Sequence, residues 1–525
     1  MRRKKKKNRE IDKLKGRFKS SLSGLYKALL VGVLVAFQFC VILLLPYLLR
    51  TNSVYFYMIL EIASIIVILN LINDNRSPSY KISWICICLA LPISGHIMFI
   101  LWGNQGVNDK IEKKSLECME HGRKYLKTHA PLMEEYRKIY SYKSRLAGYL
   151  ERMGFPLTKN NQLEYFPMGE DAFEAMFVDL KEAKKFIFVD FFIVAEGALW
   201  DKVHEILQKK VKEGVEVRFM YDDFGAMMRT EKNFPRELEN EGFQVQVFNP
   251  IYKYTEKLYM NYRSHQKIVV VDGNIGYVGG FNLADEYVNI IERFGTWKDN
   301  GLRIVGDAVW GLTVTFLQMW EICSGRLDTD YEKYRPDMLF RQNGCYCQVI
   351  SDGPCFRMEN AIENAYLQMI YYASDFLYIT TPYLIIEENM REALIIAAKS
   401  GVDVRIITPN IPDKKSVKLL TNYNYGLLLQ NGIRIYEYTP GFIHAKTILC
   451  EDCGIIGTIN MDYRSFYLHY ENGVFFSERK TVRKIKKDLF DTMKESREIT
   501  YEEWLSRPVS MKIKQAFLNL FSTLM

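Results

Sequence analysis

The sequence predicts an α/β fold made of two copies of one domain, preceded by N-terminal transmembrane helices. Two observations lead to this prediction. Between about residues 140 and 508 the chain alternates strand-like and helix-like segments, and the same order of segments occurs twice. Before this region, three long apolar stretches follow a strongly basic tail. A chain of 525 residues is long enough for both parts.

The basic tail, residues 1–27, accounts for the whole of the net charge of +8. Its first 20 residues include 11 Lys or Arg against Glu10 and Asp12, so the rest of the chain is nearly neutral. A nucleic-acid-binding protein usually spreads basic charge over its folded part, and we therefore expect no nucleic-acid partner. The tail fits an anchor attracted to anionic lipid headgroups, although a solvated run of charge is the alternative.

The membrane region, residues 28–103, predicts spans at about 28–49, 55–72 and 82–103. The middle stretch is the weaker one because it carries Glu61 and Asn70. The first stretch does not fit a cleaved signal peptide, since its apolar core is too long and lacks a small-residue cleavage pattern. We therefore expect a multi-pass protein of the cell membrane.

The side of the membrane that carries the large domain stays open. The basic tail favours the cytoplasm, so three spans would place the domain outside and two spans would place it inside. The loop 73–81 has two basic residues, which slightly favours three spans, whereas the seven cysteines after Gly103 are an awkward number for an external, disulfide-bonded domain. The pairs C-x-C (345 and 347) and C-x-x-C (450 and 453) have spacings that suit a zinc site poorly, so we expect free cysteines and no metal.

The repeated region predicts two domains, at 140–335 and 336–508, after a linker at 104–139 and before a C-terminal amphipathic segment at 509–525. Each domain begins with strand, helix and strand, and each helix ends at a glycine that suits a left-handed C-cap. Such alternation is typical of a mostly parallel sheet with helices on both faces. The last segment could lie on a membrane surface, with Phe517, Leu518 and Phe521 inward, or pack against the domain.

Each repeat contains the pattern His-x-Lys-x4-acid, followed by a turn of small residues and an Asn. The two sets of residues are His265, Lys267, Asp272, Gly279, Gly280 and Asn282, and His444, Lys446, Glu451, Gly457, Thr458 and Asn460. Residues two apart in a strand share a face, so we expect each His and Lys to point the same way. An imidazole, a cation and an amide suit a phosphate, and two such sets at one site could supply both a nucleophile and a general acid.

With both motifs in view, the chain resembles the phospholipase D superfamily and, within it, the bacterial cardiolipin synthases. The closer resemblance rests on the segments "HQKIVVVDGNIGYVGGFNLADEY", "FGTWKDNGLRIVG", "TTPYLI", "YTPGFIHAKT", "NMDYRSFYLHYE" and "NRSPSYKISW". It extends from about residue 73 to about residue 508, and the basic tail and first apolar stretch look like an extension.

The resemblance implies phosphatidyl transfer between two phosphatidylglycerol molecules, giving cardiolipin and glycerol without a metal or other cofactor. It implies that His265 is the nucleophile and His444 the general acid and then base, while Lys267 and Lys446 hold the phosphoryl oxygens. It further implies that Asp272 and Glu451 orient an imidazole. Asn282 and Asn460, with the small residues Gly280 and Gly457, would line the phosphate pocket. The alternatives are a membrane-bound hydrolase with the same residues and a non-catalytic membrane scaffold.

Three departures from the family pattern stand out. Glu451 replaces the usual Asp, the following turn is one residue shorter than in the first repeat, and "WKDNG" replaces the usual Trp-Arg-Asp-Thr-His. The longer Glu side chain could compensate for the shorter turn. Alternatively, Asp452 could take the role of the acid.

Overall fold

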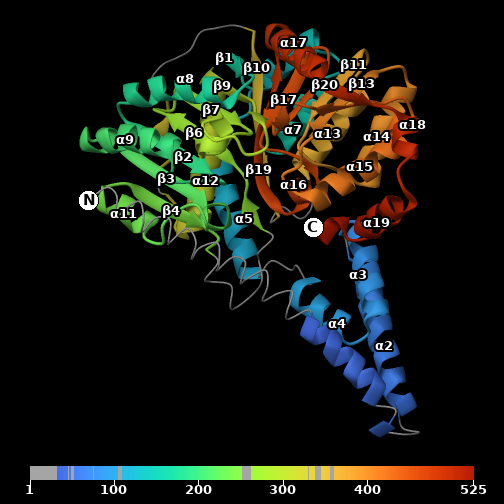
Figure 1. Ribbon diagram of the computed structural model, residues 1–525. Coiled ribbons are helices and arrows are strands. Elements are labelled where there is room, and N and C mark those ends of the chain that lie inside the picture. Colours follow the sequence, from blue (N-terminus) through green and yellow to red (C-terminus); the bar gives the residue numbers. More distant parts are fainter. Residues whose placement is uncertain are drawn as a thin grey trace. The chain divides into compact units, whose positions relative to one another are not determined.

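The computed structural model describes residues 32–44, 47–48, 53–74, 76–103, 109–250, 262–328, 330–336, 344–354 and 360–524 (Figure 1). It divides into two compact units. The first consists of Met1–Val107, Tyr252–Tyr259 and Ala516–Met525, and the second of Asn108–Ile251 and Met260–Gln515.

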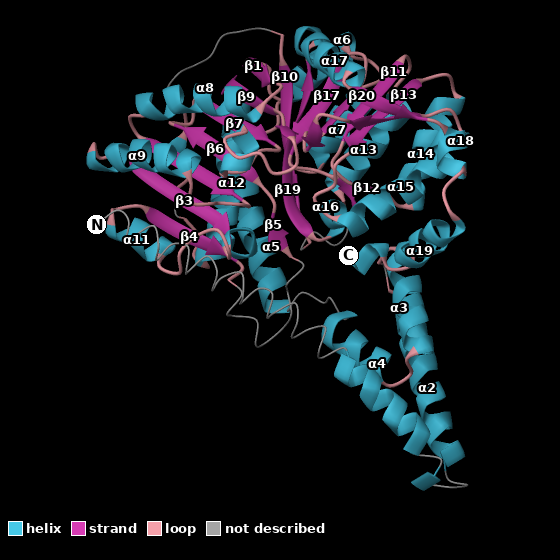
Figure 2. Ribbon diagram, in the orientation of Figure 1, coloured by secondary structure: helices cyan, strands magenta, loops and turns pink. Residues whose placement is uncertain are grey.

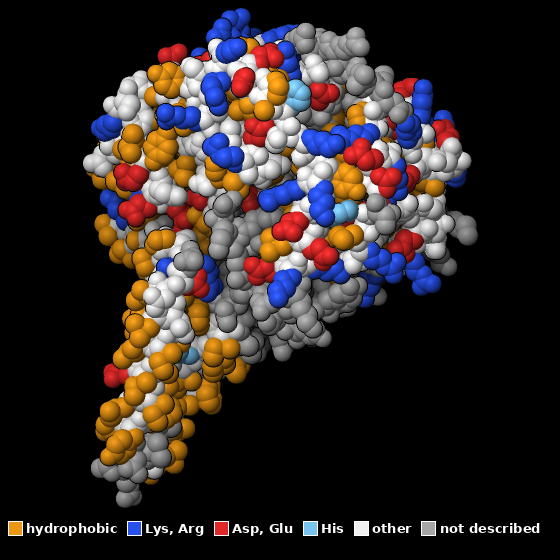
Figure 3. Space-filling view, turned by 180° about the vertical axis from the view of Figure 1, so that it is seen from behind, with side chains coloured by type: hydrophobic (Ala, Val, Ile, Leu, Met, Phe, Trp, Pro, Cys, Tyr) orange, Lys and Arg blue, Asp and Glu red, His pale blue; other side chains and the backbone are white. Residues whose placement is uncertain are grey.

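The first unit is built from apolar helices. Its elements are the helix Gly32–Leu44, α2 (Ser53–Ile72), α3 (Pro78–Ala90), α4 (Ser94–Met98), the π-helix η2 (Phe99–Gly103) and the 3-10 helix η7 (Ser522–Leu524). Within the described part of the chain, Val54–Ile72 is the one helix long and apolar enough to cross a bilayer. Of the span expected at 28–49, residues 28–31, 45–46 and 49 lie outside the described residues. Hydrophobic side chains cover most of this unit's face in Figure 3.

The segment 82–103, expected as one span, is not one continuous helix. The chain turns after α3, at Leu91–Ile93, and returns antiparallel to α3 as α4 and η2. The guanidinium of Arg76 donates to the carbonyl oxygen of Gly103 at 2.8 Å, which places both ends of the segment side by side. The cause of the break is Pro92, which removes a backbone donor and disfavours a helical conformation at the residue before it.

The second unit contains two large sheets with one topology, which confirms the predicted duplication (Figure 2). The first sheet has the order β1-β9-β7-β6-β2-β3-β4 and the second the order β10-β19-β17-β16-β11-β13-β14-β20. The strands of the first are β1 (Asn161–Phe166), β2 (Phe186–Phe191), β3 (Glu216–Asp222), β4 (Gln244–Phe248), β6 (Lys267–Val271), β7 (Ile275–Gly279) and β9 (Gly301–Gly306). Those of the second are β10 (Tyr346–Asp352), β11 (Phe376–Thr380), β13 (Asp403–Pro409), β14 (Arg434–Tyr438), β16 (Thr447–Leu449), β17 (Cys453–Gly457), β19 (His469–Ser477) and β20 (Ser496–Ile499).

Helices accompany both sheets, and each sheet has its own hydrophobic core. In the first repeat they are α8 (Gly169–Glu182), α9 (Ala198–Lys212), α10 (Asp223–Ala226), α11 (Phe234–Asn240) and α12 (Ala308–Ser324). In the second they are α13 (Ala361–Tyr372), α14 (Glu388–Lys399), α15 (Lys415–Gln430), α16 (Tyr463–Tyr467), α17 (Arg479–Lys494), α18 (Tyr501–Leu505) and α19 (Val509–Asn519).

The sheets are mixed, and the expectation of mostly parallel sheets is wrong. Strands β2, β3 and β4 are parallel, as are β11, β13 and β14. The strands that follow the motif histidines, β6 and β16, run antiparallel to β2 and β11. This direction places Lys267 at the start of β6 opposite Phe191 at the end of β2. The motif residues therefore lie at the carboxyl edge of the parallel strands, where α/β proteins usually bind ligands.

The segment 104–139, expected as a linker, instead contributes helices to the second unit. It holds α5 (Asp109–Arg123) and α6 (Ala130–Ile139), and α7 (Ser144–Arg152) follows. The side-chain amide of Gln318 in α12 donates to the carbonyl oxygen of Met119 in α5 at 2.9 Å. In the C-terminal segment, α19 leaves Phe517 63% exposed, so this residue does not pack inward against the protein.

Candidate functional site

The two motif histidines precede their strands and do not lie in them as expected. His265 lies between the short strand β5 (Arg263–Ser264) and β6, and His444 lies between β15 (Gly441–Ile443) and β16. The side chains of both histidines are buried. Each short strand pairs with a strand of the other repeat, and this pairing builds the site.

In the first of these pairs, β5 runs parallel to the beginning of β19, with Ser264 opposite Tyr470. The next residues along the two strands are His265 and Glu471. The backbone amide of His265 donates to the carbonyl oxygen of Tyr470 at 2.8 Å, which extends the ladder to the histidine. Asp222 anchors β5 from the other side, because its carboxylate accepts a hydrogen bond from the Ser264 amide at 3.0 Å.

The second pair repeats this arrangement with the halves exchanged. Strand β15 runs parallel to β8 (Thr296–Lys298), and the last residues of the two strands are opposite each other. The next residues are His444 and Asp299. The His444 amide donates to the carbonyl oxygen of Lys298 at 2.7 Å. Each repeat thus delivers its histidine to a carboxylate of the other.

The carboxylates contact the imidazoles directly. The two oxygens of Glu471 lie 2.9 and 3.0 Å from Nδ1 of His265, and Oδ2 of Asp299 lies 2.6 Å from Nδ1 of His444. An ionised carboxylate only accepts, so Nδ1 of each ring carries the proton. Nε2 is then the nitrogen that remains for chemistry. We call these contacts the crossed His–carboxylate pairs.

Sequence reasoning assigned no role to Asp299 or Glu471, although a signal for them was present. Both acids open the same tripeptide, acid-Asn-Gly, at equivalent places after the two motifs. The asparagines behave alike as well. The side-chain oxygen of Asn472 accepts from the Lys267 amide, and that of Asn300 accepts from the Lys446 amide, each at 3.3 Å. The doubled tripeptide could have found all four residues.

Asp272 does not orient an imidazole, so the role expected for it is wrong. Its carboxylate accepts hydrogen bonds from three consecutive backbone amides at the start of β2, those of Lys184, Lys185 and Phe186, at 2.8, 2.8 and 2.9 Å. The residue has a left-handed conformation, with φ of 53°. Asp272 therefore fastens the turn after β6 to the first residues of β2 and acts on the histidine only through the strand.

Glu451 has the corresponding structural place in the second repeat, so the role expected for it is corrected in the same way. One of its oxygens accepts from the backbone amides of Ser374, Asp375 and Phe376 at 2.8, 2.6 and 3.2 Å. The other lies 3.2 Å from the ammonium of Lys143. Asp452, the alternative acid, instead pairs with the exposed Arg479 at 2.9 Å. The longer Glu side chain thus reaches the same kind of backbone target across a turn that is one residue shorter.

The two motif lysines are buried and point back along their own strands. The ammonium of Lys267 donates to the carbonyl oxygen of His265 at 2.6 Å, and that of Lys446 donates to the carbonyl oxygen of His444. Burial lowers the pKa of Lys267 to about 7 and the pKa of Lys446 to about 8. A bound anion would stabilise the charged forms of both lysines, so this pair of cations suits a phosphate.

Both imidazoles are neutral near pH 7. Burial, followed by the charges of Lys267 and Lys446, holds the pKa of His265 well below 6.5. Burial and Lys446 lower the pKa of His444 to about 4, even though Asp299 opposes the shift. The charges of His444 and Lys446, which belong to the second repeat, lower the pKa of His265 in the first repeat. The two repeats therefore form one shared electrostatic site.

Asn282 and Asn460, the predicted asparagines, are buried, and each has a side-chain polar atom without a hydrogen-bond partner among the described residues. Asn282 accepts a hydrogen bond from the Ile193 amide at 2.9 Å, while its NH₂ group has no partner among the described residues. The side-chain oxygen of Asn460 likewise has no partner within the described ranges. A buried amide donor without a partner suits an anionic oxygen that arrives with the substrate.

The small residues at the predicted turns have an explanation within the protein itself. A Cβ atom at Gly280 would collide with the carboxylate of Asp299, and one at Gly457 would collide with the backbone of Asn472. Gly280 thus leaves room for a crossed pair, and Gly457 for the neighbouring strand. In the second repeat Thr458 replaces Gly280, and its hydroxyl donates to Glu471.

The donor set fits an anion better than a metal ion. His265, His469 and Glu471 bring ligand atoms within 4.8 Å of one another, which is the spacing of a possible cation site. However, Nδ1 of His265 already faces the Glu471 carboxylate, and the buried Lys267 and Lys446 would repel a cation. Every cysteine that the structure describes is a free thiol.

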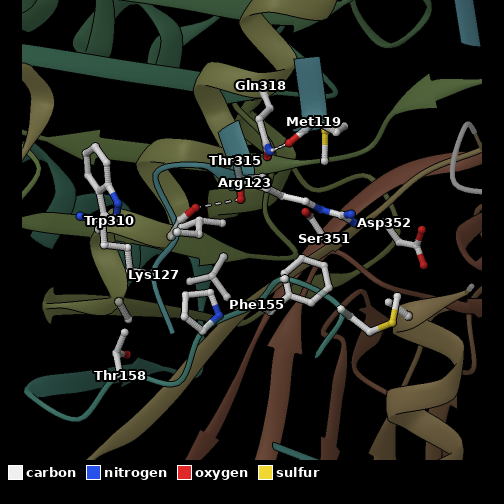
Figure 4. A pocket seen from close by; sticks show the side chains of 18 of the residues that line it. Met119, Arg123, Lys127, Phe155, Thr158, Trp310, Thr315, Gln318, Ser351 and Asp352 are labelled. Atoms are coloured by element: carbon white, nitrogen blue, oxygen red, sulfur yellow. Dashed lines mark hydrogen bonds between the residues drawn. The ribbon is translucent and has the colours of Figure 1, made fainter. Parts of the chain in front are cut away.

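A cavity of about 830 Å³ lies apart from these residues, between α5, α12 and β10 (Figure 4). Its lining includes Phe155, Trp310 and Thr315, and Figure 4 shows Arg123 reaching across it toward Ser351. It contains none of the predicted site residues. The candidate active site is therefore the buried cluster around the crossed His–carboxylate pairs and not this cavity.

Comparisons with known proteins agree with the duplication. The sequence profile described as "Cardiolipin synthase, PLD-like domain" matches residues 176–293 and 366–493, once in each repeat. A second profile, "Phospholipase_D-nuclease N-terminal", matches residues 62–104.

Cardiolipin synthase of Oceanobacillus iheyensis is 32% identical over 86% of this chain and 94% of its own length. Cardiolipin synthase of Staphylococcus aureus is 33% identical over 86% of this chain and 92% of its own length. In fold, the chain resembles phosphatidylserine synthase of Haemophilus influenzae, with a TM-score of 0.57, 14% identity, and coverage of 73% of this chain and 98% of that one.

Proposed function

Because this chain belongs to the family of cardiolipin synthases with duplicated phospholipase D-like domains, we propose that it transfers a phosphatidyl group from one phosphatidylglycerol molecule to another, releasing glycerol. The enzyme is a phosphatidyltransferase. The observation that carries the proposed reaction is the crossed arrangement of His265 with Glu471 and His444 with Asp299. It supplies two imidazoles, each with one nitrogen fixed by a buried carboxylate, beside two buried cations.

In the first half-reaction, Nε2 of His265 attacks the phosphorus of the donor lipid. A P–N bond forms, the P–O bond to glycerol breaks, and His444 gives its proton to the leaving oxygen. Glu471 stabilises the positive charge that His265 acquires, as a carboxylate does in other histidine-based sites. His444 must be protonated for this step, and the negative phosphodiester held beside it favours that form.

In the second half-reaction, a glycerol hydroxyl of another phosphatidylglycerol attacks the phosphohistidine. The neutral His444 takes the proton of this hydroxyl, a new P–O bond forms, and the P–N bond breaks to free His265. One phosphodiester replaces another, so the reaction is reversible and added glycerol drives it backward. No metal or nucleotide takes part in the proposed chemistry.

The neighbouring residues bind the phosphoryl group. Lys267 and Lys446 neutralise its non-bridging oxygens, and their lowered pKa values rise again when the anion is bound. Asn282 contributes an amide donor that has no partner among the described residues, and Asn460 lines the same pocket. Asp272 and Glu451 position the two histidine strands through backbone hydrogen bonds and do not contact the substrate.

The experiment that tests the reaction uses the purified full-length protein in vesicles of phosphatidylglycerol. We expect glycerol and cardiolipin to appear in equal amounts, and labelled glycerol added later to be incorporated into phosphatidylglycerol. His265→Ala should abolish both products, whereas the matched control Asp452→Asn, at an exposed ion pair, should not. Phosphatidic acid as the main product, unaffected by glycerol, would instead make the protein a hydrolase.

A further inference from the structure

We infer that residues 77–103 form a re-entrant hairpin, which enters and leaves the bilayer on the same face and whose tip is capped by Gln38. Residues on either side of this segment would then lie on one side of the membrane. The inference rests on contacts within the first unit and does not depend on the transfer reaction.

The two arms of the hairpin run antiparallel over their full length. Arg76 donates to the carbonyl oxygen of Gly103 at 2.8 Å, and the rings of Trp84 and Phe99 lie 5.4 Å apart. Near the tip, a Cβ atom at Gly95 would lie 2.6 Å from the carbonyl oxygen of Ile87, so this glycine allows the arms to touch. The 13 residues of α3 extend about 20 Å, which is less than the bilayer's hydrocarbon thickness of about 30 Å.

The tip of the hairpin would be costly in lipid without a partner, since the turn leaves backbone amides outside a helix. Gln38 provides that partner from the helix Gly32–Leu44. Its side-chain oxygen accepts from the amides of Ile93 and Ser94 at 3.2 and 2.9 Å and from the Ser94 hydroxyl at 2.7 Å. Gln38 is 2% exposed, although the residues beside it face outward. This contact explains a polar residue in the middle of the first apolar stretch.

The C-terminal end of the chain meets the hairpin near its entrance. The hydroxyl of Ser83, in the second turn of α3, donates to the carbonyl oxygen of Leu520 at 2.6 Å and lies 3.3 Å from the Thr523 hydroxyl. The ammonium of Lys81 donates to the carbonyl oxygen of Ile72, so the end of α2 is at the same level. The loop after α2, the exit at Gly103 and the C-terminal residues therefore share one end of this unit.

The surroundings of the hairpin fit lipid. Apolar side chains along the Gly32–Leu44 helix and α2 are more than half exposed, among them Phe37, Phe39, Tyr55, Ile59, Ile62 and Ile66. The hydroxyl of Tyr57 in α2 donates to the carbonyl oxygen of Ile42, which ties the first helix to the second. The apolar stretch 28–49, which contains the Gly32–Leu44 helix, has 22 residues in the sequence, and α2 has 20, so each is long enough to cross the bilayer. These two stretches are the crossings, and the hairpin adds none.

The number of crossings decides the side of the large domain. With two crossings, the domain lies on the side of the basic tail, and the 11 Lys or Arg of the first 20 residues hold that tail in the cytoplasm. The cytoplasm also suits the free cysteines of the described residues. The active site would then draw its lipids from the cytoplasmic leaflet.

Labelling of native lysines tests the topology without any substitution. Lys81 and the exposed Lys113 flank the segment 82–103. We expect a membrane-impermeant amine reagent to modify both in inside-out vesicles and neither in intact cells, as read by peptide mass spectrometry. Modification of Lys113 from the face opposite to Lys81 would overturn the hairpin and restore a third crossing.

Substitution of Gln38 tests the cap. Gln38→Met keeps the size of the side chain but removes the acceptor, and we expect the melting temperature in detergent or nanodiscs to fall by about 3 °C or more. The matched control is Phe39→Leu, one residue along and 57% exposed, which should leave it unchanged. If the melting temperature of Gln38→Met equalled those of the control and the wild type, the role of Gln38 as the cap would be refuted.

Discussion

The Glu471 carboxylate contacts Nδ1 of His265 through both oxygens, at 2.9 and 3.0 Å, although the two residues belong to different repeats. Asp299 and His444 have the converse relationship at 2.6 Å. Neither repeat alone can therefore hold its own histidine in a fixed tautomer. This interdependence gives a physical reason for two copies of the motif in one chain, beyond the need for both a nucleophile and an acid.

Loss of a crossed carboxylate should impair the chemical steps more than lipid binding. Glu471→Gln and Asp299→Asn keep the shape of the side chain but remove the charge that stabilises an imidazolium. We expect each to lower kcat by about 10²- to 10⁴-fold, with KM for phosphatidylglycerol changed much less. Steady-state kinetics in mixed micelles, with Asp452→Asn as the control, measure both constants. A rise in KM at unchanged kcat would show that these carboxylates serve binding instead.

Loss of a motif acid should reduce stability more than chemistry. Glu451 is half-buried, and this burial would raise its pKa, but hydrogen bonds from the amides of Asp375 and Ser374 outweigh the effect and lower that pKa. A lowered carboxyl pKa contributes stability above the unfolded value of about 4.5, and this contribution disappears as the pH falls through the folded value. At pH 7, Glu451→Gln should therefore have a melting temperature several degrees below that of the wild type. The difference between the two melting temperatures should become smaller toward pH 4.

The corresponding test in the first repeat is Asp272→Asn, which removes acceptors for three backbone amides at the start of β2. For both variants we expect kcat per folded molecule to stay within about tenfold of the wild type, in contrast to Glu471→Gln. Active-site titration of the folded fraction makes this comparison. A loss of turnover as large as that of Glu471→Gln, at unchanged melting temperature, would return the acids to a direct role at the imidazole.

The pH dependence of kcat/KM should have an acidic limb and an alkaline limb, set by the two histidines and the two lysines of the site. His265 must be neutral to attack, and because its pKa is held well below 6.5, the acidic limb should lie below pH 6.5. His444 must be protonated to act as the acid, so kcat/KM should already decline above the His444 pKa of about 4. Lys267 and Lys446 must be charged to bind the phosphate, so the decline on this alkaline limb should steepen between about pH 7 and about pH 8. Assays of wild-type protein from pH 5 to pH 9 would show it. Activity that keeps rising above pH 9 would exclude the lysines as the source of that limb.

Much of the fold and part of the site could be predicted from the sequence. The duplication follows from the matched order of strands and helices, and the motif pattern identifies His265, Lys267, His444 and Lys446, which the structure buries at one edge of the sheets. Asp299 and Glu471 lie outside the His-x-Lys-x4-acid pattern and reach the histidines through strand pairs between repeats, on which the spacing of the motif carries no information. Their sequence signal is the doubled acid-Asn-Gly tripeptide. The hairpin at 77–103 was missed for a similar reason. Hydropathy measures length and composition, whereas the turn depends on Pro92 and on Gln38, a residue 55 positions before Ile93.

The central claim is one shared site whose nucleophile lies in one repeat and whose acid lies in the other. Covalent trapping tests this claim most directly. A phosphatidyl ester of p-nitrophenol has a leaving group that needs no protonation, so the first half-reaction should survive His444→Ala while the second is slowed. We predict that this variant accumulates a phosphatidyl adduct on the peptide that contains His265, detected by mass spectrometry after a rapid quench. His265→Ala should yield no adduct. An adduct on His444 in His265→Ala, or turnover without any adduct in the wild type and in His444→Ala, would contradict this mechanism.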